Sequence, residues 1–164
     1  MNWLKHGVCV ALVAIALIAA HDAPAQMNDR KVLTLDAARK VAAAAEAEAM
    51  KNRWNVVIAV VDDGGHLIYL QRLDGTQNGS IEVAQRKART AVNFKRPTKV
   101  FEDAIAGGRT AVLALTEVGA FPLEGGVPLM YQGQIVGAIG VSGVTSQQDG
   151  VVAKAGAESM ASMP

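Results

Sequence analysis

The sequence is poor in residues that several common functions require. Its 164 residues include one cysteine, Cys9, and three histidines, and aromatic residues make up only 4%. A lone cysteine excludes a disulfide within the chain, and so few aromatic rings argue against a protein that stacks nucleic-acid bases. The formal net charge is +1, with one basic run at residues 86–99. We therefore expect no nucleic-acid partner.

The N-terminal segment has the three parts of a secretory signal peptide. Lys5 precedes an apolar run at residues 7–20, and Ala23-Pro24-Ala25 supplies small residues for cleavage. The run is too short for a comfortable membrane span, although an uncleaved anchor is the alternative. The sequence predicts a signal peptide at residues 1–25 and one domain at residues 26–164. That domain would be periplasmic or secreted, with no stable membrane span after cleavage.

Cleavage would remove most of the ligand chemistry in the chain. Cys9, His6 and His21 lie in the predicted signal peptide, so the mature chain keeps His66 as its single histidine. Such a chain has no cysteine nucleophile and cannot build a zinc site from two histidines of its own. His66 is therefore its strongest nitrogen ligand.

The hydrophobic pattern predicts two β-hairpins interleaved with helices, which gives an α+β domain with a largely antiparallel sheet covered by helices. Turn signals at Asp63-Gly64-Gly65 and Gln132-Gly133 separate the strands of the two hairpins. Ser146 and Asp149 predict a capping box for the last helix. The predicted strands are 55–62, 66–72, 127–131 and 134–141, the predicted helices are 35–51, 80–96, 99–106 and 147–162, and 109–120 fits either a strand or a helical turn.

Five segments form a series along the chain: TLDAARKV, VVDDGGHLIYLQRLDG, SIEVAQRKARTAVNF with KRPT, LEGGVPL and GQIVGAIGVSG. This series, from about Leu33 to Met160, resembles the GlcG/HbpS family of haem-binding or haem-degrading proteins, and it is similar to the C-terminal domain of PduO-type proteins. The resemblance implies a profilin-like, three-layer α/β/α fold with about five strands. It implies homo-oligomers and, for some members, haem as a cofactor, whereas a shared fold alone does not fix the function.

His66 is the first candidate site residue. It opens the second predicted strand beside the Gly64-Gly65 turn and matches the histidine in the GGH segment of the family. Imidazole is a good axial ligand for haem iron, so we predict His66 as a metal ligand in a cofactor site. The alternative is a histidine that bonds a loop carbonyl. Arg72 would share its strand face about 20 Å away, or form an ordinary surface pair with Asp74.

The loop Glu124-Gly125-Gly126-Val127-Pro128 is the second candidate. Its glycine pair can bring backbone N–H groups close to a ligand, although it lacks the Lys-Ser/Thr ending of a phosphate-binding loop. We predict that Glu124, Gly125, Gly126 and Pro128 contribute to a site for haem or another small anionic ligand. A turn that only positions the next strand is the alternative.

The basic helix that precedes Pro97 is open to two interpretations. Its cations could bind the propionates of a cofactor, or they could form a solvated helix face, which the pattern favours. Thr98 follows at the start of the next predicted helix, where anions often bind. The basic residues are Lys87, Arg89, Lys95 and Arg96.

Three functions are compatible with these residues. The first is an exported haem-binding or haem-handling protein. The second is an enzyme for a small oxygenated metabolite, with His66, Asp62, Asp63 or Glu124 as acid or base. The third is an accessory sensory protein that acts through a partner. The sequence has no nucleophile elbow, catalytic triad motif or zinc pattern, so whether the chain is an enzyme stays open at this level.

Overall fold

A computed structural model describes residues 29–163 of the chain. The predicted signal peptide, residues 1–25, lies outside the described residues, and so do Cys9, His6 and His21. The chain divides after Arg30, and the unit that begins at Lys31 is the one described below. Across residues 29–163, no helix combines the length and apolarity that a membrane crossing needs.

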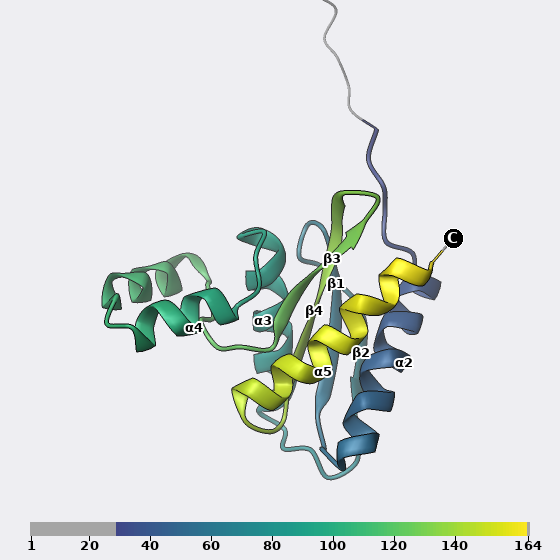
Figure 1. Cartoon of the computed structure of the whole chain (residues 1–164), viewed down its shortest axis with the longest axis horizontal. Coiled ribbons are helices and arrows are strands. Elements are labelled where there is room, and N and C mark those ends of the chain that lie inside the picture. Colours follow the sequence, from purple (N-terminus) through teal and green to yellow (C-terminus); the bar gives the residue numbers. More distant parts are fainter. Residues whose placement is uncertain (1–28, 164) are drawn as a thin grey trace, which may run out of the picture. The chain divides into compact units, whose positions relative to one another are not determined.

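The fold has three layers, with a four-stranded antiparallel sheet in the middle (Figure 1). The strands lie in the order β2-β1-β4-β3. Helix α3 covers one face, and α2 and α5 cover the other. The predicted α/β/α architecture is confirmed, with four strands instead of about five. The bounds are α2 Leu35–Asn52, β1 Val57–Asp62, β2 Leu67–Arg72, α3 Ser80–Asn93, α4 Lys99–Ala106, η1 Thr110–Val118, β3 Gly126–Tyr131, β4 Gln134–Ser142, α5 Ser146–Glu158 and η2 Ser159–Ser162.

The central strand β1 divides the hydrophobic core into two halves. Val57, Ala59 and Val61 pack toward α3, whereas Ile58 and Val60 pack in the cluster that α2 and α5 share. All five side chains are fully buried. Because both faces of β1 are covered, its sequence is a continuous apolar run and does not alternate with polar residues.

Small residues let the helices rest closely on the sheet and on one another. The alanine stripe of α2 is buried. A Cβ at Gly140 of β4 would lie 2.0 Å from the backbone oxygen of Ala84 on α3, so only glycine fits there. The alanine stripe of α2 is therefore buried by contacts within the chain, so no partner subunit is needed to cover it.

The start of α5 differs from the prediction. Its capping box joins Thr145 and Gln148, each side chain bonding the backbone N–H of the other residue. Ser146 and Asp149 are not the capping pair, because Asp149 turns inward to accept a hydrogen bond from the Val144 N–H at 3.2 Å. The capping box was therefore predicted one residue too far along the chain, because Thr145 and Gln148 have the same capping chemistry as Ser146 and Asp149.

The ambiguous segment at residues 109–120 is helical. It forms the 3₁₀ helix η1, which closes at Gly119 with φ of 89° and, together with α4, projects away from the sheet (Figure 1). The sheet formed by residues 29–163 therefore has four strands and no fifth. Helix α3 also ends earlier than predicted, at Asn93, because Lys95 adopts a left-handed conformation with φ of 54°.

Candidate functional site

The turn between β1 and β2 is organised by one carboxylate. Asp62 Oδ1 accepts hydrogen bonds from the backbone N–H groups of Gly64, at 2.9 Å, and His66, at 2.8 Å. Partial burial acts to raise the pKa of Asp62, but the hydrogen bonds from these two N–H groups outweigh it and lower the pKa below 3.8. Asp62 is therefore an anion at neutral pH, and it holds the turn in one conformation.

The same carboxylate orients the ring of His66. The Nδ1 atom of His66 lies 3.3 Å from Asp62, and the side chain is 83% exposed. The ring partner is thus a carboxylate and not the loop carbonyl that the alternative interpretation expected. A carboxylate favours the proton on Nδ1, which leaves the exposed Nε2 atom with a lone pair available to a ligand.

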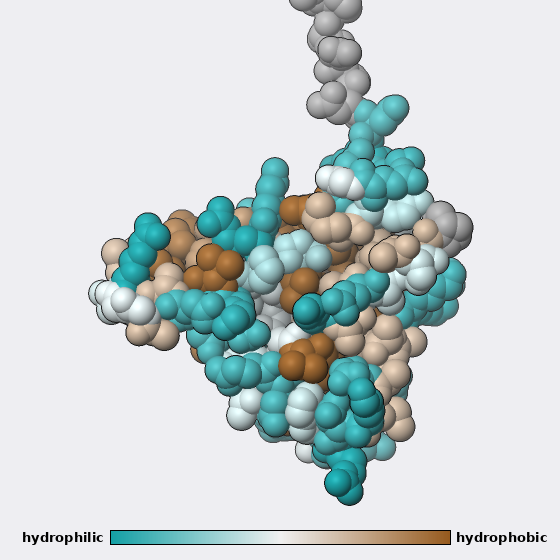
Figure 2. Space-filling view, viewed as in Figure 1, coloured by the Kyte–Doolittle hydropathy of each residue, from teal (hydrophilic) through white to brown (hydrophobic). Residues whose placement is uncertain are grey.

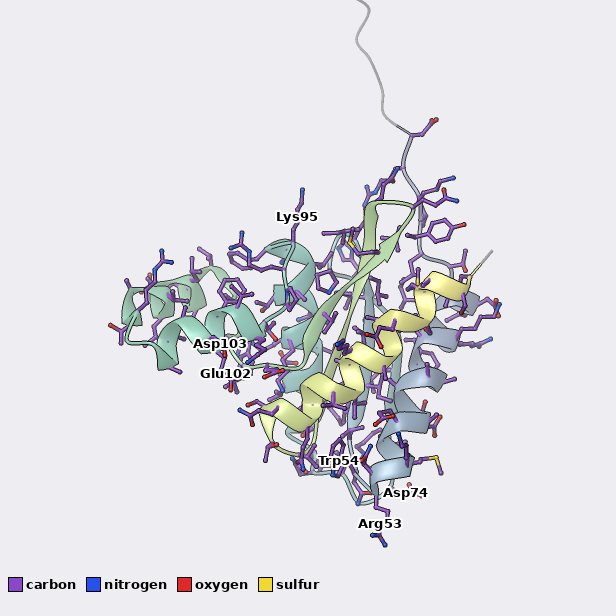
Figure 3. The ribbon with its side chains drawn as sticks, in the orientation of Figure 1. Arg53, Trp54, Asp74, Lys95, Glu102 and Asp103 are labelled. Atoms are coloured by element: carbon purple, nitrogen blue, oxygen red, sulfur yellow. The ribbon has the colours of Figure 1, made fainter. Side chains whose placement is uncertain are left out.

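A cavity of about 540 Å³ lies beside this turn. Its volume falls within the range of about 300–1,000 Å³ that is typical of small-molecule sites. Asp63 belongs to both the turn and the cavity, whereas His66 is not among the lining residues. Figure 3 shows Lys95 extending outward from the end of α3. The lining residues are Asp63, Val92, Lys95, Met130, Gly133, Gln134 and Ile135.

Arg72 lies at the far end of β2 from this turn. It pairs across the sheet with Val57, at the opposite end of β1 from Asp62. Its guanidinium donates a hydrogen bond to the side-chain oxygen of Asn78, so its partner is Asn78 and not Asp74.

The Gly125-Gly126 loop, at the start of β3, is held by hydrogen bonds from α4. The backbone N–H of Thr98 donates to the Gly126 oxygen at 2.9 Å, and the Gly126 N–H donates to the Thr98 hydroxyl at 2.9 Å. The carboxylate of Glu102 accepts a hydrogen bond from the Glu124 N–H. Thr98 therefore does not cap α4 with its side chain or offer an anion site, because its hydroxyl is fully buried against the loop.

A buried ion pair lies directly beneath this loop. Lys87 Nζ is 2.7 Å from Asp149 Oδ2 and 3.1 Å from the backbone oxygen of Val141, and the two charged side chains are 2% and 3% exposed. Burial raises the pKa of Asp149, and Lys87 offsets only part of that effect. A Cβ at Gly125 would lie 2.9 Å from Lys87 Nζ, so the missing side chain makes room for the pair. For Lys87, the expectation of a solvated helix face is wrong.

The loop also borders a smaller cavity of about 290 Å³. The Glu124 side chain, 16% exposed, borders it and lies 3.6 Å from Lys99 Nζ. Lys99 also pairs with Asp103 at 2.8 Å. Asp103 lies on α4, where Figure 3 labels it. A partly buried carboxylate beside an ammonium group can bind a small polar ligand or exchange a proton with it. The other lining residues are Pro97, Gly125, Gly126, Val127, Gly150 and Lys154.

Within one chain, the predicted site residues do not converge. His66 and Arg72 belong to the β2 edge of the sheet, whereas the loop with Glu124, Gly125 and Gly126 and the strand residue Pro128 belong to the β3 edge. Strands β1 and β4 lie between them, which separates the two edges by about 14 Å at the usual strand spacing. The structure thus contains two separate candidate sites.

The sequence did contain a signal for the buried pair. Ala84, Ala88 and Ala91 form the apolar stripe of α3, and Lys87 lies three residues after the first and four before the last. Residues at those spacings share one helix face. A lysine on an apolar stripe predicts a buried ammonium group with a specific partner, although nothing local identifies that partner as Asp149.

The chain is a three-layer α/β/α protein, because helices cover both faces of its four-stranded antiparallel sheet. A Gly-Gly-His turn lies at one edge of the sheet and a Gly-Gly loop at the other. The chain belongs to the family described as haem degrading protein HbpS-like, which matches residues 33–158. It is 45% identical to the protein GlcG of Escherichia coli over 116 residues, which cover 71% of this chain and 85% of GlcG. The resemblance drawn from the five sequence segments is confirmed.

Two solved structures share this fold. One is a double mutant of HbpS from Streptomyces reticuli, with 35% identity, a TM-score of 0.71, and coverage of 85% of this chain and 96% of that one. The other is a complex of PduOC with haem, with 25% identity, a TM-score of 0.72, and coverage of 79% of this chain and 95% of that one. The description of the family and one of the related structures therefore both concern haem.

Proposed function

We propose that this chain binds haem, with the Nε2 atom of His66 as the iron ligand. The observation that carries the proposal is the exposed His66 ring, with Nδ1 held by the ionised Asp62. Metal-binding histidines usually donate their second ring N–H to a carboxylate, which fixes the ring and raises its basicity. The relative whose structure is a complex with haem also supports haem as the ligand.

The available donors suit haem better than a bare metal ion. Within residues 29–163, no group of three or more His, Cys, Asp or Glu side chains could hold a metal. A structural or catalytic metal ion needs about three or four protein ligands, whereas haem brings four nitrogens of its own and needs one axial ligand from the protein. A single oriented imidazole is therefore sufficient.

The surroundings of His66 would supply the remaining contacts. Leu67, the next residue, is a large apolar side chain that is nearly half exposed. The adjoining cavity, which Asp63 borders, adds Lys95, a cation suited to a propionate. Bound haem would supply axial coordination and redox chemistry at its iron, while the protein would hold and orient it.

Binding of hemin to the purified protein tests this proposal. A Soret band should develop on titration, and His66→Ala should weaken hemin affinity at least about tenfold because one coordinate bond is lost. Arg72→Ala, at the other end of β2, should bind like wild type if the β2 edge holds haem by His66 alone. Lys51→Ala, an exposed change on α2, is the neutral control. Unchanged hemin binding by His66→Ala would contradict the proposal.

We also propose that the chain works outside the cytoplasm, in the periplasm or as a secreted protein. Its support is the signal-peptide pattern at residues 1–25. Fusion of residues 1–26 to a reporter should export the reporter, and mass spectrometry of the exported protein should find a start near Gln26. An intact Met1 in the exported protein would contradict this.

A second candidate function is an activity on a small oxygenated metabolite at the cavity beside Glu124. The observation that favours it is the Glu124 carboxylate, largely buried and 3.6 Å from Lys99 Nζ. Glu124 would exchange a proton with the ligand, and Lys99 would bind a ligand carboxylate. A metabolite screen should find binding or turnover that Glu124→Gln abolishes and His66→Ala leaves intact.

A further inference from the structure

A third cavity, of about 200 Å³, lies at the end of the domain where the β3–β4 hairpin turns. The residues that lead into α2 reach this end, and so does the C-terminal helix η2 (Figure 1). The cavity shares no lining residue with the cavities that Asp63 and Glu124 border. It is therefore a separate feature of the fold.

The walls of this cavity belong to the hydrophobic core. Leu33, Val136 and Met160 are 6%, 2% and 5% exposed and form part of the cluster that α2 and α5 share. Protein interiors rarely leave voids larger than a water molecule, and an apolar cavity of about 150 Å³ stays dry and binds benzene. An opening of this size in the core therefore suits a compact apolar molecule.

Small and flexible side chains keep this space open. Ala37 of α2 lines the cavity with a single methyl group. Met160 and Met163 are three residues apart at the end of η2 and both line it, as expected for a helix with three residues per turn. Unbranched thioether side chains adjust their shape to what they contact. The walls can thus close around ligands of slightly different shape.

The cavity is lined by a cation and by no acid. Of its nine lining residues, Lys31 carries the one charge, and no ion pair joins Lys31 to an acidic residue within the described chain. The Thr34 hydroxyl accepts a hydrogen bond from the Ala37 N–H at 3.2 Å and can still donate its own proton. Asp63 and Glu124 place a carboxylate in each of the other two cavities, so this one is the best suited to an anionic head group.

We propose that this cavity binds a small monocarboxylic acid with a compact apolar body. The body, of about six to eight carbons by comparison with benzene in a slightly smaller cavity, lies among Leu33, Val136 and the two methionines. The carboxylate lies at the mouth, toward Lys31 and Thr34. In the view of Figure 2, hydrophobic and hydrophilic residues are mixed over this end of the domain, at the upper right, which suits a mouth that takes a polar head group. The site is independent of haem binding and of Glu124.

Isothermal titration calorimetry with three probes tests the ligand class. Hexanoate carries both the apolar body and the charge, hexan-1-ol carries the body alone, and acetate carries the charge alone. Hexanoate should bind wild type with a Kd of about 1 mM or tighter, because burial of its methylene groups drives binding. Hexan-1-ol should bind about three- to fivefold more weakly, which is the size of an exposed charge interaction. Acetate should give no binding at the same concentrations.

Two substitutions locate the site. Ala37→Phe places a ring in the cavity and should abolish binding of hexanoate and of hexan-1-ol. Ala43→Phe, at an exposed position of the same helix, is the matched control and should bind like wild type. Lys31→Gln should weaken hexanoate binding to the level of hexan-1-ol and leave hexan-1-ol unchanged. Circular dichroism checks that the variants are folded, and if Ala37→Phe does not fold, the exposed Lys31→Gln change decides the test.

The inference is overturned by a wild type that does not bind hexanoate, by hexan-1-ol binding as tightly as hexanoate, or by a folded Ala37→Phe variant that binds like wild type. A Lys31→Gln variant that keeps the wild-type preference for hexanoate also overturns it. His66→Ala and Glu124→Gln should bind hexanoate like wild type. Loss of hemin binding in His66→Ala with hexanoate binding unchanged therefore concerns the haem proposal only.

Discussion

The two edges of the sheet carry Gly-Gly turns with opposite physical character. At the β2 edge, a local carboxylate holds an exposed histidine, and the contacts that shape the turn come from within five residues, Asp62 to His66. At the β3 edge, Gly125 and Gly126 are buried. The Val141 N–H of β4 donates a hydrogen bond to the Gly125 oxygen, the Gly126 N–H donates one to the Thr98 hydroxyl, and Lys87 of α3 packs against both glycines. The first edge is open to a ligand, and the second links the layers of the fold.

Because of this difference, we expect substitutions at the two edges to affect different properties of the protein. A side chain that is exposed and locally held can be replaced with little loss of packed area. Replacing one member of a buried ion pair strands the charge of the other member in the interior. Substitutions at the β2 edge should therefore alter ligand affinity, and substitutions at the β3 edge should alter stability.

The largest effect is expected at the buried ion pair. Lys87→Met strands the Asp149 carboxylate in the interior, which should lower the free energy of unfolding by about 3–5 kcal/mol. Urea unfolding measures this. The double change Lys87→Met with Asp149→Leu removes both charges and should recover much of the loss. A single variant as stable as wild type would show that this edge does not depend on the pair.

The next effect is expected at Gly125. Its φ of 123° disfavours any side chain, and a Cβ would lie 2.7 Å from the Val141 oxygen. Gly125→Ala should lower the free energy of unfolding by about 1–3 kcal/mol. Gly79→Ala is the matched control, because a Cβ there would meet no atom within 4 Å. Equal stability of the two variants would argue against a tightly held loop.

At the β2 edge, the same measurement should give almost no change. His66→Ala should keep the free energy of unfolding within about 0.5 kcal/mol of wild type, because the ring is exposed. This is the stability control for the hemin titration. A large loss of stability would mean that the turn is as integrated into the fold as the Gly125 loop, and the contrast between the edges would fail.

The sequence predicted the elements whose signals are local. Both hairpins and α2 were predicted because β-branched runs, turn glycines and helical periodicity act over a few residues. The expected strand count of about five was one too high, because the apolar run at residues 109–120 fits a strand or a helical turn equally well and forms η1. The end of α3 was misplaced because a left-handed Lys95 has no strong sequence signature.

The candidate sites divide in the same way. The Asp62–His66 turn is contained in one hairpin, and its histidine was found from the sequence. The Lys87–Asp149 pair joins residues that are 62 positions apart. Thr98 and Gly126 are 28 apart. Such contacts depend on how the layers pack, so a single sequence could show that Lys87 lies on an apolar stripe but not what it meets.

The smallest effect concerns the pH dependence of the turn. The pKa of Asp62 is lowered in the folded chain, so its contribution to stability is fully present above its ordinary pKa of 3.8 and is lost as the pH falls through the lowered pKa. Amide exchange at Gly64 and His66 should therefore be faster in Asp62→Asn than in wild type near neutral pH. The two proteins should converge at a pH below the lowered pKa. A difference that persists there would exclude the carboxylate as the cause.

Haem binding through His66 is tested by chemical rescue of the iron ligand at position 66. His66→Gly removes the imidazole and leaves room for a free one. We expect that this variant does not co-elute with hemin in gel filtration, and that added imidazole restores co-elution together with a six-coordinate or five-coordinate imidazole Soret spectrum. Co-elution of hemin with His66→Gly in the absence of imidazole, with the wild-type Soret maximum, would contradict the assignment of His66 as the ligand.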